Sequence, residues 1–176
     1  MRLWHFSNLL TVIIDFAAWF VLHMLIALGG TLLPRRLFHE KQWLFRSRGW
    51  EKKGDFYQQL FGVIGWKDKL PDGASWFRGG FAKKRVASTN VEYLDNFVKE
   101  TCRGELVHWI VVAVSPVFFL WNPWYAGIIM IVYALASNIP CIIVQRYNRP
   151  QLMRIVKRRR EYIRKQHQPV ETGEKI

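Results

Sequence analysis

The chain has 176 residues, of which 51% are hydrophobic and 15% aromatic, and its formal net charge is +13. This combination argues against a soluble domain, because so much apolar side chain and so much charge coexist best when apolar residues form long blocks and charges lie between them. The two cysteines show no CxxC or Cys/His spacing, so no metal site is expected. We predict an all-α integral membrane protein that forms a single membrane domain over residues 1–176, with about three transmembrane helices plus interfacial amphipathic helices.

The first predicted element is an apolar block at residues 9–33, which Asp15 and His23 interrupt. A helix rises about 1.5 Å per residue, so about 20 residues cross a bilayer. The block is longer than the hydrophobic region of a secretory signal peptide, and a single basic residue, Arg2, precedes it. We therefore expect an uncleaved span, and the alternative is a signal peptide that is cleaved near Ala27-Leu28-Gly29.

Residues 34–104 follow as a basic loop, in which lysine and arginine outnumber aspartate and glutamate. Aromatic residues recur throughout this loop, and polar segments with many rings rarely stay in bulk water. We expect short helices that lie in the headgroup region. Near the end of the loop, residues 91–103 are expected to form a helix that enters the membrane, with Thr89 or Asn90 as its N-cap.

Two further apolar blocks, residues 106–121 and 124–144, are predicted to be the second and third spans. Asn122-Pro123 between them is a turn signal. The aromatic residues on both sides of this turn suit the far membrane interface. We therefore expect a hairpin that brings the start of the second span beside the end of the third.

Residues 145–176 form a basic tail. Apolar residues recur in it at helical spacing, which predicts a basic amphipathic helix that lies on anionic lipid headgroups. The positive-inside rule makes both the loop 34–104 and the tail cytoplasmic. The expected localisation is therefore the cell membrane, as a multi-pass protein with its N-terminus outside.

Glu105 and His108 are the candidate catalytic residues. They lie three positions apart at the start of the second span, so they share a helix face. An ionisable residue inside a span indicates function, because burying it is costly. We expect His108 to act as a general base that Glu105 orients. The alternative is that both lie at the interface and pair with Arg103 or Lys99. No metal is expected here, because Glu-x-x-His metal sites need further carboxylates from other helices.

The end of the third span carries a second candidate group, Gln145-Arg146-Tyr147-Asn148-Arg149-Pro150, in which the proline is expected to stop the helix. An arginine side chain is a planar fork that binds phosphate and stabilises an oxyanion. We expect Arg146 and Arg149 to hold a phosphate-bearing donor or a developing oxyanion. The alternative is a positive-inside anchor that contacts lipid phosphate. The remaining expected substrate-binding residues of this group are Asn138, Gln145, Tyr147 and Asn148.

A third candidate group is Trp66-Lys67-Asp68-Lys69-Leu70-Pro71-Asp72-Gly73. Pro-Asp-Gly is by itself a good turn, and a turn is the simpler interpretation. Lys69 and Asp72 are nevertheless candidate substrate-binding residues, with Asp72 as a carboxylate that faces the active site.

These motifs together resemble the glycosyl-4,4′-diaponeurosporenoate acyltransferase family. The resemblance rests on Glu105-Leu-Val-His108-Trp109, on Asn138-Ile-Pro140 followed by Ile142 to Pro150, and on Trp66-Lys67 followed by Leu-Pro-Asp72-Gly73. It covers the chain from about Gly30 to Leu152. The His-x4-Asp signature of glycerolipid acyltransferases is absent, because Ala113 stands where the aspartate would be.

The resemblance implies a membrane acyltransferase that esterifies a sugar hydroxyl of a glycosylated C30 carotenoid acid with a fatty acyl group, giving a staphyloxanthin-like pigment. It implies no cofactor, with acyl-CoA or acyl carrier protein as the co-substrate, and other carotenoid-pathway enzymes as candidate partners. The alternatives are acyl transfer to another glycolipid and a non-enzymatic assembly or lipid-binding protein. Nucleic acid is not an expected partner, because the basic and aromatic residues are organised around spans rather than around a groove.

Overall fold

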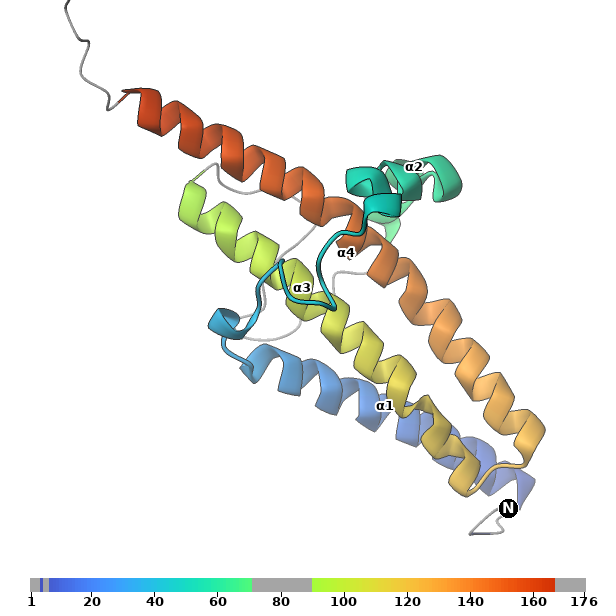
Figure 1. Ribbon diagram of the computed structural model, residues 1–176. Coiled ribbons are helices and arrows are strands. Elements are labelled where there is room, and N and C mark those ends of the chain that lie inside the picture. Colours follow the sequence, from blue (N-terminus) through green and yellow to red (C-terminus); the bar gives the residue numbers. More distant parts are fainter. Residues whose placement is uncertain (1–3, 5–6, 71–89, 167–176) are drawn as a thin grey trace, which may run out of the picture.

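The computed structural model describes residue 4, residues 7–70 and residues 90–166. Three long helices run side by side, with α3 (Val91–Val114) between α1 (Asn8–Leu32) and α4 (Trp124–Gln166) (Figure 1). A 3-10 helix, η6 (Ser115–Leu120), continues α3 toward the turn before α4. The described residues contain no strand, and all three of these helical segments are long and apolar enough to cross a membrane. The predicted all-α architecture with three spans is confirmed.

Polar caps begin two of the long helices. Ser7 Oγ accepts a hydrogen bond from the Leu10 N–H at 3.4 Å at the start of α1. Asn90 Oδ1 accepts one from the Glu92 N–H at 2.8 Å at the start of α3. Such caps satisfy backbone donors that have no partner within the helix. Asn90 is thereby confirmed as one of the two predicted caps of α3.

α1 presents most of its apolar surface outward, and only Asp15 and Gly30 within it are buried. A helix that is apolar around most of its circumference and exposed in the protein suits contact with lipid chains. Gly30 is a point of close approach to α3, because a Cβ at this position would lie 2.4 Å from Val107 Cγ2. Small residues at such crossings allow helices in a membrane to pack closely.

The second and third apolar blocks are only parts of longer helices. α3 begins at Val91, fifteen residues before the predicted span at 106–121, so the predicted helix 91–103 and that span are one element. α4 continues from the predicted span at 124–144 to Gln166 and contains both Pro140 and Pro150. The expectations that Pro150 stops the helix and that the tail is a separate helix are therefore wrong, and contact of the tail with lipid headgroups stays a prediction.

Packing explains why α4 continues past Pro150, which is itself buried. Leu152 and Val156, two of the apolar positions predicted to contact lipid, are buried against α3 instead. In Figure 1 this red part of α4 runs beside the green start of α3, beyond the end of α1. We call residues 91–103 of α3 and 150–166 of α4 the stalk. The α3 residues that bury Leu152 and Val156 are Leu94, Phe97 and Val98.

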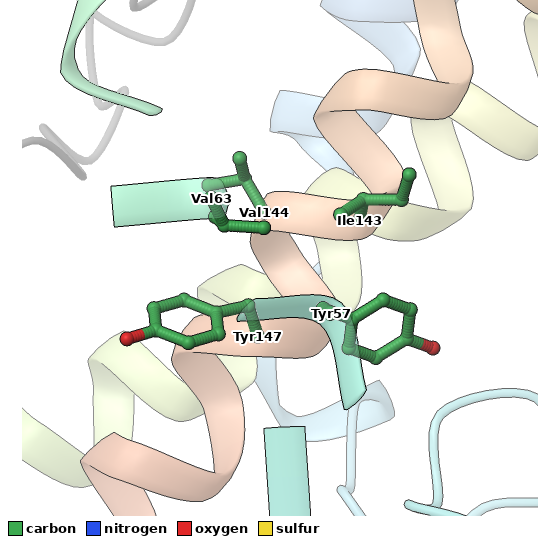
Figure 2. Packing of buried hydrophobic residues seen from close by; sticks show 5 residues of the cluster. All are labelled: Tyr57, Val63, Ile143, Val144 and Tyr147. Atoms are coloured by element: carbon green, nitrogen blue, oxygen red, sulfur yellow. The ribbon is translucent and has the colours of Figure 1, made fainter. Parts of the chain in front are cut away.

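The loop between α1 and α3 contains the short helices that its composition predicts. They are η1 (Arg35–Leu37), η2 (Gly49–Gly54), α2 (Asp55–Phe61), η3 (Val63–Gly65) and η4 (Lys67–Lys69). α2 and η3 pack on α4 through a buried apolar cluster, which Figure 2 shows from close by. This packing fixes the loop on the end of the spans. The members of the cluster are Tyr57, Val63, Ile143, Val144 and Tyr147.

A left-handed turn brings the loop against α4. Lys52, Lys53 and Gly54 have φ values of 47°, 58° and 99°. A Cβ at position 54 would lie 3.1 Å from the Tyr147 carbonyl oxygen, so glycine serves both the backbone conformation and the close approach. The Lys53 carbonyl accepts a hydrogen bond from Arg154 Nη2 at 3.1 Å, which joins the same turn to the stalk.

The opposite end of the spans is fixed by Asp15. Its Oδ1 atom accepts hydrogen bonds from Trp121 Nε1 at 2.8 Å and from Asn122 Nδ2 at 2.7 Å. A buried carboxylate needs such donors to offset the loss of its hydration. Asp15 therefore joins α1 to the predicted hairpin turn between α3 and α4.

Candidate functional site

Four charged side chains meet where α3 and α4 leave the apolar part of the bundle. Arg146 Nε lies 2.7 Å from Glu105 Oε1, and Arg146 Nη1 lies 2.5 Å from Glu51 Oε1. Arg149 Nη2 lies 2.6 Å from Glu105 Oε2. Glu51 comes from η2, Glu105 from α3 and the arginines from α4, so three elements meet here. We call these four residues the arginine–glutamate cluster; its two positive and two negative charges balance.

The arginines of this cluster also hold the loop by its backbone. Arg146 Nη2 donates to the Leu44 carbonyl at 2.6 Å, and Arg149 Nη1 donates to the Phe45 carbonyl at 2.6 Å. Arg149 Nε donates to Thr101 Oγ1 at 3.0 Å. Every side-chain nitrogen of both arginines therefore donates to a protein acceptor. The observed contacts of the pair build the scaffold, and the expected contact with a phosphate or an oxyanion stays a prediction.

A second ion group lies close to the end of α1. Arg35 Nε is 2.8 Å from Glu100 Oε1, and Arg103 Nη2 is 2.7 Å from Glu100 Oε2. Arg103 Nη1 also donates to the Thr31 carbonyl at 3.1 Å, near the C-terminus of α1. Arg103 thus pairs with Glu100, not with Glu105 or His108 as the alternative interpretation proposed. These contacts place the end of α1 beside the α3 residues that precede the arginine–glutamate cluster.

His108 does not use Glu105 as its partner. Its Nδ1 atom lies 2.8 Å from Asn138 Oδ1 on α4, whereas the Glu105 carboxylate receives hydrogen bonds from Trp109 and from the two arginines of the cluster. The expected Glu105–His108 pair is therefore corrected to a His108–Asn138 pair. The i, i+3 spacing placed both side chains on one face of α3, but cross-helix partners decide their hydrogen bonds.

Asn138 fixes which nitrogen of His108 carries the proton. Asn138 Nδ2 donates to the Ala134 carbonyl at 2.8 Å and to Ser137 Oγ at 3.0 Å. A carbonyl oxygen only accepts, so the NH₂ group of the amide faces Ala134 and its oxygen faces the imidazole. In neutral His108, Nδ1 therefore donates and Nε2 carries the lone pair. This is the tautomer that a general base needs, and Asn138, 3% exposed, holds it.

Two more predicted residues lie on α4 near Asn138: Gln145 is on the same side of the helix, and Asn148 is about 80° around it. A helix turns about 100° per residue, so Gln145, seven positions after Asn138, lies about 20° from it. Asn148 lies about 160° from Arg146 around α4 and thus away from the cluster. Both Gln145 and Asn148 are partly exposed. We call His108, Asn138, Gln145 and Asn148 the polar flank.

Three other predicted site residues are placed differently. Tyr147 lies about 180° from Asn138 around α4, and its ring is buried between α4 and the loop, as Figure 2 shows. The ring of Tyr147 packs the loop, and Lys67 Nζ lies 5.7 Å from its centroid, while sugar binding by its hydroxyl stays a prediction. Lys69 is exposed in η4. Asp72 lies outside the described residues.

Tyr57 adjoins the arginine–glutamate cluster from the loop side. Burial raises the pKa of its phenol to about 12, and the Glu51 carboxylate adds to the increase. Tyr57 is therefore neutral at physiological pH. The sequence assigns neither Tyr57 nor Glu51 a role in the site, although both belong to the stretch that resembles the family. Neither residue belongs to a span or to a chemically distinctive spacing, so no local signal identifies them.

The described residues contain no group of three or more His, Cys, Asp or Glu side chains that could hold a metal ion. The candidate site offers an oriented imidazole, the Asn138 amide that bonds to it and an ionic scaffold. Such a set suits proton transfer at a hydroxyl group.

Comparison with known proteins agrees with the resemblance noted in the sequence. The family model for glycosyl-4,4′-diaponeurosporenoate acyltransferase matches residues 40–158. A protein of that name from Staphylococcus aureus strain MRSA252 is 40% identical over 147 residues, covering 81% of this chain and 88% of the relative. The relative from strain USA300 is 39% identical with the same coverage. No solved structure matches the chain significantly.

Proposed function

Because the chain belongs to the glycosyl-4,4′-diaponeurosporenoate acyltransferase family, we propose that it esterifies a sugar hydroxyl of a glycosyl-4,4′-diaponeurosporenoate with a fatty acyl group. Acyl transfer is the activity for which the relatives are named, so the chain is an enzyme rather than the non-enzymatic membrane protein considered above. The product is a staphyloxanthin-like pigment. Another glycolipid as acceptor is the second candidate, because the polar flank contacts the sugar end of its substrate.

The His108–Asn138 hydrogen bond carries this proposal. His108 Nε2 removes the proton of the sugar hydroxyl while the hydroxyl oxygen attacks the carbonyl carbon of an acyl thioester. A C–O bond forms, and the carbonyl π electrons move to its oxygen. Collapse of this tetrahedral intermediate breaks the C–S bond, and the leaving thiolate takes the proton from His108. Asn138 keeps the imidazole in the required tautomer throughout, as the third member of a catalytic triad does.

The remaining polar flank binds the acceptor. Gln145 and Asn148 donate to and accept from sugar hydroxyls, since an amide side chain offers both functions. Lys69 and Asp72 are retained as candidate substrate contacts from the loop. Glu105, Arg146 and Arg149 support the reaction indirectly, because they hold α3, α4 and the loop in register one helical turn from His108.

Substrate chemistry matches the depth of the site. The polyene of the acceptor and the fatty acyl chain belong in the hydrocarbon layer, while the sugar hydroxyl and the thioester react near the headgroups. Pro140 lies in α4 two residues after Asn138, and a proline inside a span releases a backbone carbonyl that water can solvate in a polar cavity. We place the protein in the cell membrane with the loop and the C-terminus in the cytoplasm, in accordance with the positive-inside rule.

Reconstitution tests this function. The purified protein in lipid is supplied with a glycosylated C30 carotenoid acid and a fatty acyl thioester, and mass spectrometry detects the ester. The acyl donor is offered both as acyl-CoA and as acyl carrier protein. We expect an ester on the sugar of the carotenoid. An ester on a different glycolipid, and none on the carotenoid, would support the second candidate; no ester on any glycolipid with either donor would contradict acyl transfer at this site.

A further inference from the structure

We propose that the stalk is the docking site of an acidic acyl carrier protein, which presents the acyl thioester to the polar flank. This inference rests on the proposed function, because it names the partner that supplies the same site. Four residues on one face of α4 form the surface in question. We call Ile155, Arg158, Arg159 and Tyr162 the docking patch.

The docking patch combines positive charge with apolar surface. Its members are spaced i, i+3, i+4 and i+7, so they lie on one face of α4. They line an open hollow of about 470 Å³. Ile155 is 43% exposed and Tyr162 is 52% exposed, and the Arg159 guanidinium carbon lies 5.4 Å from the centroid of the Tyr162 ring. Cations beside exposed apolar groups suit a partner helix that bears carboxylates around a small apolar contact.

The charge of the docking patch is available to a partner. Elsewhere on the stalk, Arg160 pairs with Asp95 on α3, and Lys157 lies 3.9 Å from Glu161. Among the described residues, no acidic side chain forms a salt bridge with Arg158 or Arg159. Their guanidinium groups can therefore form bidentate pairs with carboxylates of an incoming protein.

The height of the stalk favours a soluble protein over lipid headgroups. The headgroup layer adds only about 5 to 7 Å on each side of the hydrocarbon core. Arg149, in the arginine–glutamate cluster, lies near the level at which α1 ends. Arg158 follows nine residues later in the same helix, about 13 Å farther along its axis. α4 runs from its apolar span to Gln166 as one helix, and packing of Leu152 and Val156 holds this part of it beside α3.

The docking patch also lies above the polar flank. Asn148, Ile155 and Tyr162 are spaced seven residues apart, so they follow one side of α4 with a drift of only about 20° per step. The distance along the helix from Asn148 to Arg158 is about 15 Å. A carrier protein bound at the patch would therefore hold its flexible acyl-bearing arm on the Asn148 side of α4, about 80° around the helix from Asn138, the partner of His108.

Direct binding tests the proposal. The full chain is placed in nanodiscs of zwitterionic lipid, and the binding of fluorescently labelled fatty acyl carrier protein is measured at physiological salt. We expect Arg158→Glu/Arg159→Glu to weaken binding at least tenfold. The matched control is Lys157→Glu/Arg164→Glu, which reverses the same number of exposed charges on the opposite side of the helix. It should change binding less than threefold, since screening at this salt limits unspecific attraction to about 8 Å. Circular dichroism checks that both variants retain their helices.

Equal weakening in both variants, or none in the first, would overturn the proposal. Patch-dependent stimulation of transfer by anionic lipid, with no carrier binding, would also overturn it in favour of a lipid contact. Transfer from acyl-CoA separates this inference from the proposed function. If acyl-CoA gives product but no carrier protein binds, the docking proposal is rejected and the proposed function is retained. If the carrier binds through the patch but no donor gives product, the reaction fails and docking stands.

Discussion

Arg149 donates through Nη2 to Glu105 Oε2 over 2.6 Å, and the two residues are only 1% and 0% exposed. The bond joins α4 to α3 at the level where the loop docks. Burying a charge is costly unless an opposite charge and hydrogen bonds compensate for its lost hydration. Each member of this pair is stable in the interior because the other member and further hydrogen bonds provide that compensation. Glu105 is therefore essential to the fold as the acceptor of two arginines, and its effect on catalysis follows from that.

Glu105→Gln should lower the free energy of unfolding by about 3 to 5 kcal/mol, because it leaves two buried guanidinium groups without their shared carboxylate. Thermal unfolding in detergent, followed by circular dichroism, measures the loss. Glu161→Gln is the control, since Glu161 lies on the exposed part of the stalk with Lys157 3.9 Å away, and it should change stability by less than about 0.5 kcal/mol. Equal stability of the two variants would refute the structural role.

The same substitution should have opposite effects at two glycines. Gly54→Ala should destabilise the protein by about 1 to 2 kcal/mol, because an alanine there must adopt a left-handed φ beside the Tyr147 carbonyl. Gly29→Ala should stabilise it by about 0.5 to 1 kcal/mol, since Gly29 lies inside α1 and an alanine methyl there would meet nothing within 4 Å. The unfolding midpoints of the two variants and of the wild type measure these effects. An unchanged midpoint in Gly54→Ala would mean that the left-handed turn does not constrain the loop.

The raised pKa of Tyr57 predicts a stability change at high pH. Below about pH 10, the folded and the unfolded protein both keep the phenolic proton, so stability does not depend on it. Between pH 10 and about 12, the unfolded chain loses the proton while the folded protein retains it, so stability falls by about 2 to 3 kcal/mol. Tyr57→Phe should remove this part of the decline. The free energy of unfolding is measured as a function of pH for wild type and variant. The same decline in both proteins would show that the pKa of Tyr57 is not raised by folding.

Asn138 is a positioning residue, and its loss should affect turnover more than affinity. Asn138→Ala should lower kcat about 10- to 100-fold with KM changed less than threefold, because the imidazole loses its fixed tautomer but the acceptor keeps its other contacts. Ser137→Ala is the control: Ala134 still anchors the Asn138 amide, so kcat should stay within threefold. A parallel rise in KM in Asn138→Ala would instead indicate that Asn138 binds the sugar directly.

The sequence predicts the spans well, because a continuous apolar block of sufficient length rarely forms anything other than a transmembrane helix. It predicts the ends of α3 and α4 poorly. Pro150 disfavours a helix by about 3 kcal/mol on local grounds, but burial of Leu152 and Val156 against α3 lies outside any local window. The predicted apolar face of the tail exists, and α3 covers part of it: Leu152 and Val156 are buried, whereas Ile155 and Tyr162 are exposed.

The candidate site shows the same limit. His108, Asn138, Arg146, Arg149 and Glu105 all stand out as polar residues next to or within apolar segments. Spacing along one helix suggested the pair Glu105–His108, because only neighbours on the same helix can be inferred from spacing. His108 bonds to Asn138, and Glu105 bonds to two arginines, all on α4, as well as to Trp109 on its own helix. Glu51 comes from a loop with no periodic signal. The packing of the whole bundle decides which residues of two helices face each other. The sequence of a single segment therefore does not predict these pairs.

The central claim is that His108, oriented by Asn138, removes the proton of the acceptor hydroxyl. The most direct measurement compares kcat for acyl transfer in His108→Gln and in His23→Gln. His23 is a matched control, since it also lies in a span and its Nδ1 bonds to a carbonyl, that of Trp19 at 2.8 Å. We predict that His108→Gln lowers kcat at least 100-fold with its helical content intact, and that His23→Gln stays within threefold of wild type. Wild-type turnover in folded His108→Gln would contradict the account and assign proton transfer to another group.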